Sequence, residues 1–239
     1  MEVTKRQLGA FKTIVDTYKS GTTFPKRHEW KLLDNNSLWL RLVGQVNVVG
    51  GVDGNDRFFE RPELIKKINF SSLSKIKLEK ELALKINSVL REAGVRYASA
   101  DLTKCSKTKS LVHNYKFISQ YKNGFKGLLQ ELADIKGETA EVQRVHFLTS
   151  NFKYIKNKSA RDFLMGLGIN RNTVAIDIRI QNIFKRFGLP LPSQAELSRR
   201  IIYEAAEKNI VDKICKPLNI EPVQFDRILF QNYDSILKN

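Results

Sequence analysis

Apolar residues recur every three or four positions along almost the whole chain, and this spacing constrains the fold more than any other feature. The clearest sets are Phe11, Ile14, Val15 and Tyr18; Leu82, Ile86, Val89, Leu90 and Ala93; and Phe125, Leu128, Leu129 and Leu132. Such spacing gathers the apolar side chains on one face of an α-helix. We therefore predict an all-α protein of about ten helices, given typical helix and loop lengths.

Helix ends are marked by glycine and by a capping pattern. Four periodic segments are each followed by a glycine, namely Gly94, Gly137, Gly168 and Gly188. Glycine is the usual residue just beyond a helix C-terminus. Ser193 and Glu196 have the spacing of a capping box, which predicts a helix start at that point.

The β-branched and glycine-rich segment 46–54 fits two structures. Its composition suits a strand and a turn. However, one helical face is kept by four apolar residues, Leu38, Leu42, Val46 and Val49. We therefore predict a helix over about residues 37–50.

The charge balance points to a polyanionic partner. The 239 residues include 41 Lys and Arg against 25 Asp and Glu, a net charge of +16. Such an excess attracts nucleic acid, and an acidic membrane surface is the alternative. We favour nucleic acid because the basic residues are scattered through ordinary helical segments and no amphipathic membrane anchor stands out.

The apolar segments and the cysteine count argue against a membrane-spanning, a secreted or a disulfide-rich protein. No segment is long and apolar enough to cross a bilayer, and residues 1–6 are not followed by the apolar stretch of a secretory signal. We expect an intracellular protein, cytoplasmic and nucleoid-associated if the source is prokaryotic. Cys105 and Cys215 are the two cysteines, so a disulfide framework and any site with four thiolates are excluded.

Residues 140–168 have the pattern of two helices joined by a short turn. Backbone amides at the turn and at the second helix start have no intrahelical partners, so they can bind a phosphate oxygen. Nearby lysines add positive charge. The predicted DNA-backbone contacts are Lys153, Ile155, Lys156 and Asn157. A solvated turn is the alternative for the two lysines.

Lys158 and Asp177 form a candidate catalytic pair. Lys158 lies in the first turn of a predicted helix, where the helix dipole and neighbouring cations favour a neutral, nucleophilic amine. Asp177 lies at a later helix start, far enough along for one helix and a loop to bring it back beside the lysine. Taken alone, the lysine would be a surface charge and the aspartate a helix N-cap.

The context of this pair resembles a known family. Lys158-x-Ala160-x-x-Phe163-Leu164, then Gly168, then Ala175-Ile176-Asp177-x-Arg179-Ile180 resembles the helix-hairpin-helix DNA glycosylase superfamily, most closely the archaeal and bacterial 8-oxoguanine glycosylase/lyases. Residues 38–45, 94–97 and 114–118 are similar to upstream parts of that family. The likeness spans roughly Leu38 to Gly188.

The resemblance implies two helical domains that flank an active-site cleft. Residues 36–173 would form a six-helix barrel containing the helix-hairpin-helix, at about 140–168. Residues 1–35 and 174–239 would form the second domain. The family turn usually reads leucine, proline, glycine, aliphatic, glycine, whereas this chain has Phe152-Lys153-Tyr154-Ile155-Lys156. We expect a distorted hairpin, because residues with side chains resist the conformations that glycine permits.

The resemblance also implies an activity. A damaged base in double-stranded DNA, 8-oxoguanine by preference, would be flipped out of the helix. Lys158 would attack the sugar, expel the base and form a Schiff base that permits strand cleavage, while Asp177 stabilises charge and assists proton transfer. The family needs no metal and no organic cofactor, and we expect a monomer.

Four residues are candidates for the base pocket: Gln45, Trp39, Phe225 and Phe230. Aromatic residues are more often core residues, and a glutamine in a helix is more often satisfied by a neighbour. The alternatives to a glycosylase/lyase are a non-enzymatic helix-hairpin-helix DNA-binding module, a monofunctional glycosylase that uses Asp177 and water, and a helical adaptor for an acidic protein.

Overall fold

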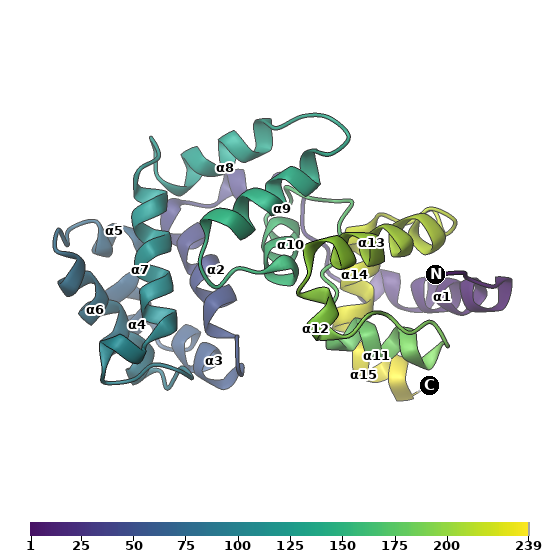
Figure 1. The fold of residues 1–239 in the computed structure, drawn as a ribbon, viewed down its shortest axis with the longest axis horizontal. Helices are drawn as coiled ribbons and strands as arrows, with labels where there is room; N and C mark the ends of the chain where they lie inside the picture. Colours follow the sequence, from purple (N-terminus) through teal and green to yellow (C-terminus); the bar gives the residue numbers. More distant parts are fainter. Residues whose placement is uncertain (239) are drawn as a thin grey trace. The chain divides into compact units, whose positions relative to one another are not determined.

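The computed structural model describes residues 1–238, and every regular element among them is helical. The all-α prediction is confirmed. Fifteen α-helices are present in this part of the chain. This is more than expected, because several are segments of one or two turns that apolar periodicity does not separate. The residues form two compact units: Met1–Arg27 with the chain from Lys156 onward, here called the terminal unit, and His28–Ile155, the middle unit (Figure 1).

The terminal unit brings the first helix against helices from the end of the chain. Its helices are α1 (Lys5–Tyr18), α10 (Asn157–Gly166), α11 (Ile178–Arg186), α12 (Gln194–Leu197), α13 (Arg200–Ile210), α14 (Pro222–Gln231) and α15 (Tyr233–Lys238). Phe11 of α1 packs on Phe184 of α11 and Phe225 of α14, with ring centroids 4.9 and 5.7 Å away. All three rings are fully buried. Each buried ring stabilises the core by about 1.5–3 kcal/mol.

The middle unit is a continuous segment of chain. Its helices are α2 (Asn35–Asn47), α3 (Asp53–Phe59), α4 (Pro62–Ile68), α5 (Phe70–Leu73), α6 (Glu79–Glu92), α7 (Ser106–Ser119), α8 (Phe125–Asp134) and α9 (Ala140–Asn151). Trp39 of α2 is fully buried, and its indole N–H donates to the Ile68 carbonyl at 2.8 Å. The Tyr115 ring meets it edge-on at 5.6 Å. This contact joins α2, α4 and α7.

Several predicted helix ends are confirmed. The predicted end near Gly50 is the exception: α2 ends at Asn47, residues 48–50 form a turn, and α3 begins at Asp53. Ser193 and Glu196 form the predicted capping box at the start of α12. The four glycines predicted to follow helices all have positive φ, between 67° and 104°. Side chains are rarely tolerated in that conformation.

The two units are bounded differently from the predicted domains. The predicted barrel, residues 36–173, includes α10, whereas α10 groups with the terminal unit. The physical reason is polar bonding: Asn157, Arg161 and Asp162 all bond to residues of the terminal unit. These contacts are too distant in sequence to be predicted from local pattern.

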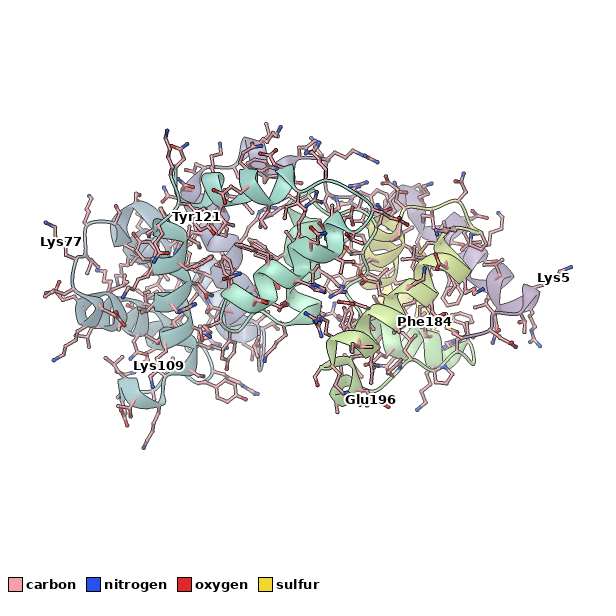
Figure 2. The ribbon with its side chains drawn as sticks, turned by 45° about the horizontal axis from the view of Figure 1, so that its top comes forward. Lys5, Lys77, Lys109, Tyr121, Phe184 and Glu196 are labelled. Atoms are coloured by element: carbon pink, nitrogen blue, oxygen red, sulfur yellow. The ribbon has the colours of Figure 1, made fainter. Side chains whose placement is uncertain are left out.

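Many lysines lie at the surface of both units. Lys5, Lys77 and Lys109 are exposed, and Figure 2 shows Lys5 and Lys77 extending away from the ribbon. This distribution agrees with the scattered basic residues of the sequence. No helix within residues 1–238 combines the length and apolar character needed to cross a membrane.

Candidate active site

Lys158 lies in the first turn of α10, the position predicted for it. Its side chain is 34% exposed, and its Nζ lies 3.3 Å from Oδ2 of Asp162, one turn later on the same helix. No side chain caps the first amides of α10. The amine is therefore accessible to solvent and held by one carboxylate.

Asp177 is the N-cap of α11 and is half-buried. Its Oδ1 accepts hydrogen bonds from the backbone N–H groups of Arg179 at 2.9 Å and Ile180 at 3.1 Å. Within residues 1–238, no hydrogen bond or ion pair joins Asp177 to Lys158, and Oδ2 of Asp177 accepts none. The N-cap role is thus present, and it leaves one carboxylate oxygen available.

The loop that leads into Asp177 is held by three buried side chains. Three successive backbone N–H groups donate to them: Val174 to Glu207 Oε1 at 2.8 Å, Ala175 to Asp226 Oδ1 at 2.8 Å, and Ile176 to the Tyr203 hydroxyl at 2.7 Å. Glu207 and Tyr203 come from α13, and Asp226 from α14. Buried backbone amides require such partners, so these contacts fix the entry to α11.

Arg161 connects the helix of Lys158 to this loop. Its guanidinium is 0% exposed and bonds Glu207 with both Nε and Nη2, at 2.7–2.9 Å. Glu207 in turn binds the Val174 amide. The Arg161 guanidinium also lies 4.2 Å from the centre of the Tyr203 ring. A single buried network therefore fixes α10, which carries Lys158, relative to the loop that ends at Asp177.

A second set of polar side chains surrounds Asp162, the partner of Lys158. Oδ1 of Asp162 accepts from Arg227 Nη2 at 2.8 Å, and Arg227 Nε lies 3.9 Å from Oδ2 of Asp226. Asp226 is 2% exposed. Burial raises its pKa to about 7, despite the nearby arginine. One lysine, one arginine and two carboxyl groups thus form a connected cluster.

The turn between α9 and α10 lacks glycine but is well satisfied. Asn114 of α7 is fully buried; its Oδ1 accepts from the Lys153 N–H at 2.7 Å and its Nδ2 donates to the Lys153 carbonyl at 3.0 Å. Tyr154 has a φ of +67°, in the left-handed region that costs a non-glycine residue about 1–2 kcal/mol. Lys156 has an ordinary extended backbone. The strain expected from the missing glycines is confined to Tyr154.

The predicted DNA-backbone residues differ in accessibility. Lys153 and Lys156 are exposed, whereas Ile155 is 2% exposed. Asn157 is buried, and its Nδ2 donates to the carbonyls of Leu197 and Ser198 at 3.2 and 3.3 Å. Asn157 therefore anchors α10 within the terminal unit with its side chain, and any contact with a ligand would use its backbone.

The four base-pocket candidates also differ in how far their side chains are exposed. Trp39 and Phe225 are 0% exposed and contribute to the cores of the middle and terminal units, respectively. Gln45 and Phe230 are half-buried. The Arg179 guanidinium lies 4.1 Å from the centre of the Phe230 ring. Gln45 and Phe230 are thus the two candidates with accessible surface.

Lys107 was not singled out in the sequence, and it organises the end of α2. It is fully buried and donates to the carbonyls of Asn47 at 2.8 Å and Val49 at 2.6 Å. Burial lowers the pKa of Lys107 to about 8. Its contacts fix the turn that follows Gln45.

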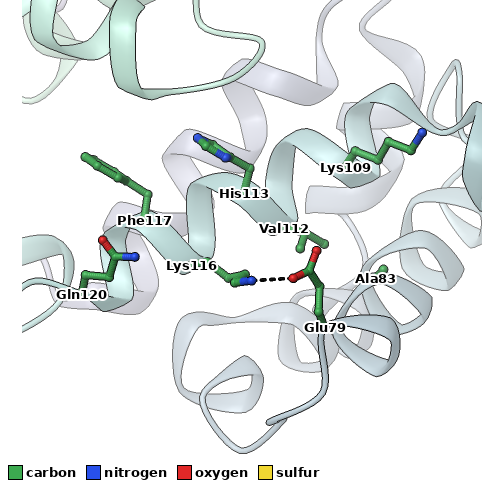
Figure 3. A pocket seen from close by; sticks show the side chains of 8 residues that line it. All are labelled: Glu79, Ala83, Lys109, Val112, His113, Lys116, Phe117 and Gln120. Atoms are coloured by element: carbon green, nitrogen blue, oxygen red, sulfur yellow. Dashed lines mark hydrogen bonds and ion pairs between the residues drawn. The ribbon is translucent and has the colours of Figure 1, made fainter.

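A hollow of about 310 Å³ lies between α6 and α7 (Figure 3), and none of the predicted site residues lines it. Four of its polar side chains already have partners. Lys116 pairs with Glu79 across it, His113 Nε2 bonds the Asn151 carbonyl, and Lys109 donates to the Thr103 carbonyl. Within residues 1–238, no three His, Cys, Asp or Glu side chains gather as metal ligands.

Sequence reasoning missed Asp162, Glu207, Asp226 and Arg227. Asp162 was detectable, because a residue four positions after Lys158 lies on the same helix face. Glu207, Asp226 and Arg227 lie at least 46 positions after the α10 residues that they neighbour. In the sequence they are ordinary polar residues of amphipathic helices.

Comparison with known proteins identifies the fold. No family model and no curated protein matches the chain. The 8-oxoguanine DNA glycosylase of Thermotoga maritima is similar over 94% of this chain and 93% of its own, with a TM-score of 0.59 and 22% identity. The Methanocaldococcus jannaschii 8-oxoguanine glycosylase/lyase, in complex with a 15mer DNA containing 8-oxoguanine, is similar over 96% of both chains, with a TM-score of 0.62 and 17% identity. This chain has the same fold.

Proposed function

We propose that this chain is a DNA N-glycosylase with AP lyase activity that removes an oxidised base, 8-oxoguanine by preference, from double-stranded DNA. The main support is the buried Arg161–Glu207 network, which ties the helix of Lys158 to the loop of Asp177. Further support comes from a fold shared with two 8-oxoguanine glycosylases. The net charge of +16 suits a DNA ligand. Such a function places the protein inside the cell.

Lys158 is the proposed nucleophile. The lone pair of its neutral amine forms a bond to C1′ of the flipped nucleoside as the C1′–N bond to the base breaks. The base departs with that electron pair and takes up a proton. One of the two Nζ protons passes to the departing base. The nitrogen lone pair then forms the C1′=N bond of a protonated Schiff base as the C1′–O4′ bond breaks and O4′ takes up a proton. Loss of a C2′ proton then breaks the bond between C3′ and its phosphate oxygen.

Asp177 is the proposed electrostatic partner. Its Oδ1 is occupied by the amides of α11, so the carboxylate has a fixed orientation. Its Oδ2 accepts no hydrogen bond from residues 1–238 and can face positive charge on the sugar. A fixed charge of this kind stabilises a transition state without reorganisation.

DNA-backbone binding is proposed for the turn and for the start of α10. The uncapped amides of the first turn of α10 suit a phosphate oxygen, and the exposed ammonium groups of Lys153 and Lys156 add charge. Ile155 and Asn157 would contribute only their backbone groups. Gln45 and Phe230 are the remaining proposed contacts with the flipped base.

The test is incision of duplexes that carry 8-oxoguanine, uracil, an oxidised pyrimidine or an alkylated purine, with borohydride present to trap a Schiff base. We expect trapping on the 8-oxoguanine duplex and its loss in Lys158→Gln. Asp177→Asn should slow base release by at least tenfold, in the range of electrostatic and acid–base effects. Lys185→Gln, which removes an exposed lysine of α11, is the matched control.

Three outcomes separate the alternatives. Base release that persists without trapping would indicate a monofunctional glycosylase that uses Asp177 and water. Salt-sensitive binding with no base release from any duplex would indicate a non-enzymatic DNA-binding module. Trapping that persists in Lys158→Gln would remove Lys158 from the proposed role.

A further inference from the structure

The Lys158 amine shares its carboxylate partner with an arginine. Oδ2 of Asp162 lies 3.3 Å from Lys158 Nζ, and Oδ1 of the same group accepts from Arg227 at 2.8 Å. The side chains of Asp162 and Arg227 are 17% and 14% exposed, whereas Lys158 is 34% exposed. The two better-buried groups therefore form a support for the more exposed amine.

Arg227 is itself held on more than one side. Its Nε lies 3.9 Å from Oδ2 of Asp226, and its guanidinium carbon lies 5.9 Å from the centre of the Phe230 ring. Because burial raises the pKa of Asp226 to about 7, that group carries only part of a negative charge at neutral pH. Asp162 is thus the principal anionic partner of Arg227.

The charge balance of this cluster bears on nucleophilicity. A carboxylate beside an amine favours the ammonium form, which cannot attack a carbon. Arginine keeps its proton at any physiological pH, so Lys158 is the cation that can release one. By attracting the same carboxylate, Arg227 weakens the hold of Asp162 on the Lys158 proton.

The other charged side chains near Lys158 on α10 and α11 have partners of their own. Arg161, on the same helix, is paired with Glu207 of α13. Arg179 lies over the Phe230 ring. Asp177 is engaged with the amides of α11 through one oxygen. None of these bonds to the Lys158 amine within residues 1–238, which leaves Asp162 as its direct partner.

We propose that Asp162 is a positioning residue for the Lys158 amine, and that Arg227 shares this carboxylate so that the amine loses its proton readily. The inference rests on the proposed function, since it concerns the nucleophile of that reaction. It adds an aspartate and an arginine to a site that the sequence motif limits to Lys158 and Asp177.

The variants Asp162→Asn and Arg227→Met test the proposal because they should act in opposite directions. The readout is the single-turnover rate of borohydride trapping on a duplex with an abasic site, measured from pH 6 to 9. Arg227→Met should raise the pH of half-maximal trapping by about one unit, because Asp162 then acts on Lys158 alone. Asp162→Asn should lower that pH by about one unit and reduce the plateau rate roughly tenfold, because the amine loses its orientation.

Controls separate charge effects from loss of fold. Arg227→Lys keeps a cation beside Asp162 and should stay within a few tenths of a pH unit of the wild type. Lys185→Gln and Asp234→Asn remove exposed charges of the same signs in the same unit and should leave the profile unchanged. Circular dichroism of each variant verifies folding. Unchanged midpoints in both test variants, or shifts in the same direction, would overturn the proposal.

A second measurement does not depend on activity. Lysines are methylated reductively with a ¹³C label, and the Lys158 resonance, assigned by its loss in Lys158→Gln, is titrated by NMR in the free protein. The same opposite shifts in midpoint are expected. If the wild type fails to trap on any duplex, the proposed function fails, whereas the titration still decides whether Asp162 and Arg227 control the amine.

Discussion

Two short loops lead into the helices that carry Lys158 and Asp177, and they are stabilised by different chemistry. The backbone of Lys153 is bound by one uncharged side chain, Asn114, and Tyr154 beside it accepts a strained conformation. Residues 174–176 are bound by Glu207, Asp226 and Tyr203, two of which can carry charge. The first loop depends on a neutral amide. The second depends on buried charges that must stay paired, so it should cost more to disrupt and respond to pH.

The largest effect is expected where the second loop loses its charge pairing. Glu207→Gln keeps the size of the side chain but leaves the fully buried Arg161 guanidinium without its counter-charge. Removing one partner of a buried ion pair costs about 3–5 kcal/mol. We expect urea unfolding of the terminal unit to show a loss of about that size, with faster amide exchange at residues 174–176. Asp234→Asn is the control, and a loss below about 1 kcal/mol in Glu207→Gln would contradict the comparison.

A smaller effect is expected at the first loop. Asn114→Ala removes both hydrogen bonds to Lys153, and the free energy of unfolding should fall by about 2 kcal/mol. The loss should be the same at pH 5 and pH 8, since no charge is involved. His113→Ala, at the neighbouring exposed position, should cost less than about 1 kcal/mol. A pH-dependent loss in Asn114→Ala would remove the contrast between the loops.

The pH response of the second loop is expected to come from Asp226. Burial raises its folded pKa to about 7, above the unfolded value of about 3.9. Between these values the folded protein binds a proton that the unfolded chain has lost, so stability should fall as pH rises from about 4 to about 7. The wild type should lose about 1 kcal/mol per pH unit relative to Asp226→Asn in urea unfolding at pH 5, 6 and 7. A wild-type free energy of unfolding that rises with pH relative to that of Asp226→Asn would have the opposite sign and would refute this assignment.

The smallest effect is expected from the strain at Tyr154. Tyr154→Gly and Tyr154→Ala both remove the contact of the hydroxyl with Ser106, but only glycine relieves the left-handed backbone. The glycine variant should be about 1 kcal/mol more stable than the alanine variant in urea unfolding, because relief of strain exceeds the entropic cost of glycine. Equal stabilities would indicate that the turn is not strained.

The same contrast explains how much could be predicted from the sequence. Helices follow from local spacing, so α9, α10 and α11 lie where the pattern predicts, with Lys158 and Asp177 at helix starts. The side chains that bind residues 174–176 lie between 27 positions away in the sequence, for Tyr203, and 51, for Asp226. Asn114, which binds Lys153, lies 39 positions away. Local pattern carries no information on such pairs. The missing glycines predicted strain within residues 152–156, but the sequence does not show that Tyr154 alone takes the left-handed conformation. The buried Lys107 resembles a surface lysine in the sequence.

The discontinuity of the terminal unit has a consequence for the order in which the protein folds. Residues 28–155 are continuous, so the middle unit can fold while the rest of the chain is still being synthesised. Phe11 packs against Phe184 and Phe225, so it can be buried only after these two residues have left the ribosome. The supports of Asp177 also come from α13 and α14, which are made after it. The candidate active site is therefore completed only after α14 has been synthesised, and a chain released before α14 would carry Lys158 and Asp177 without the framework that fixes them.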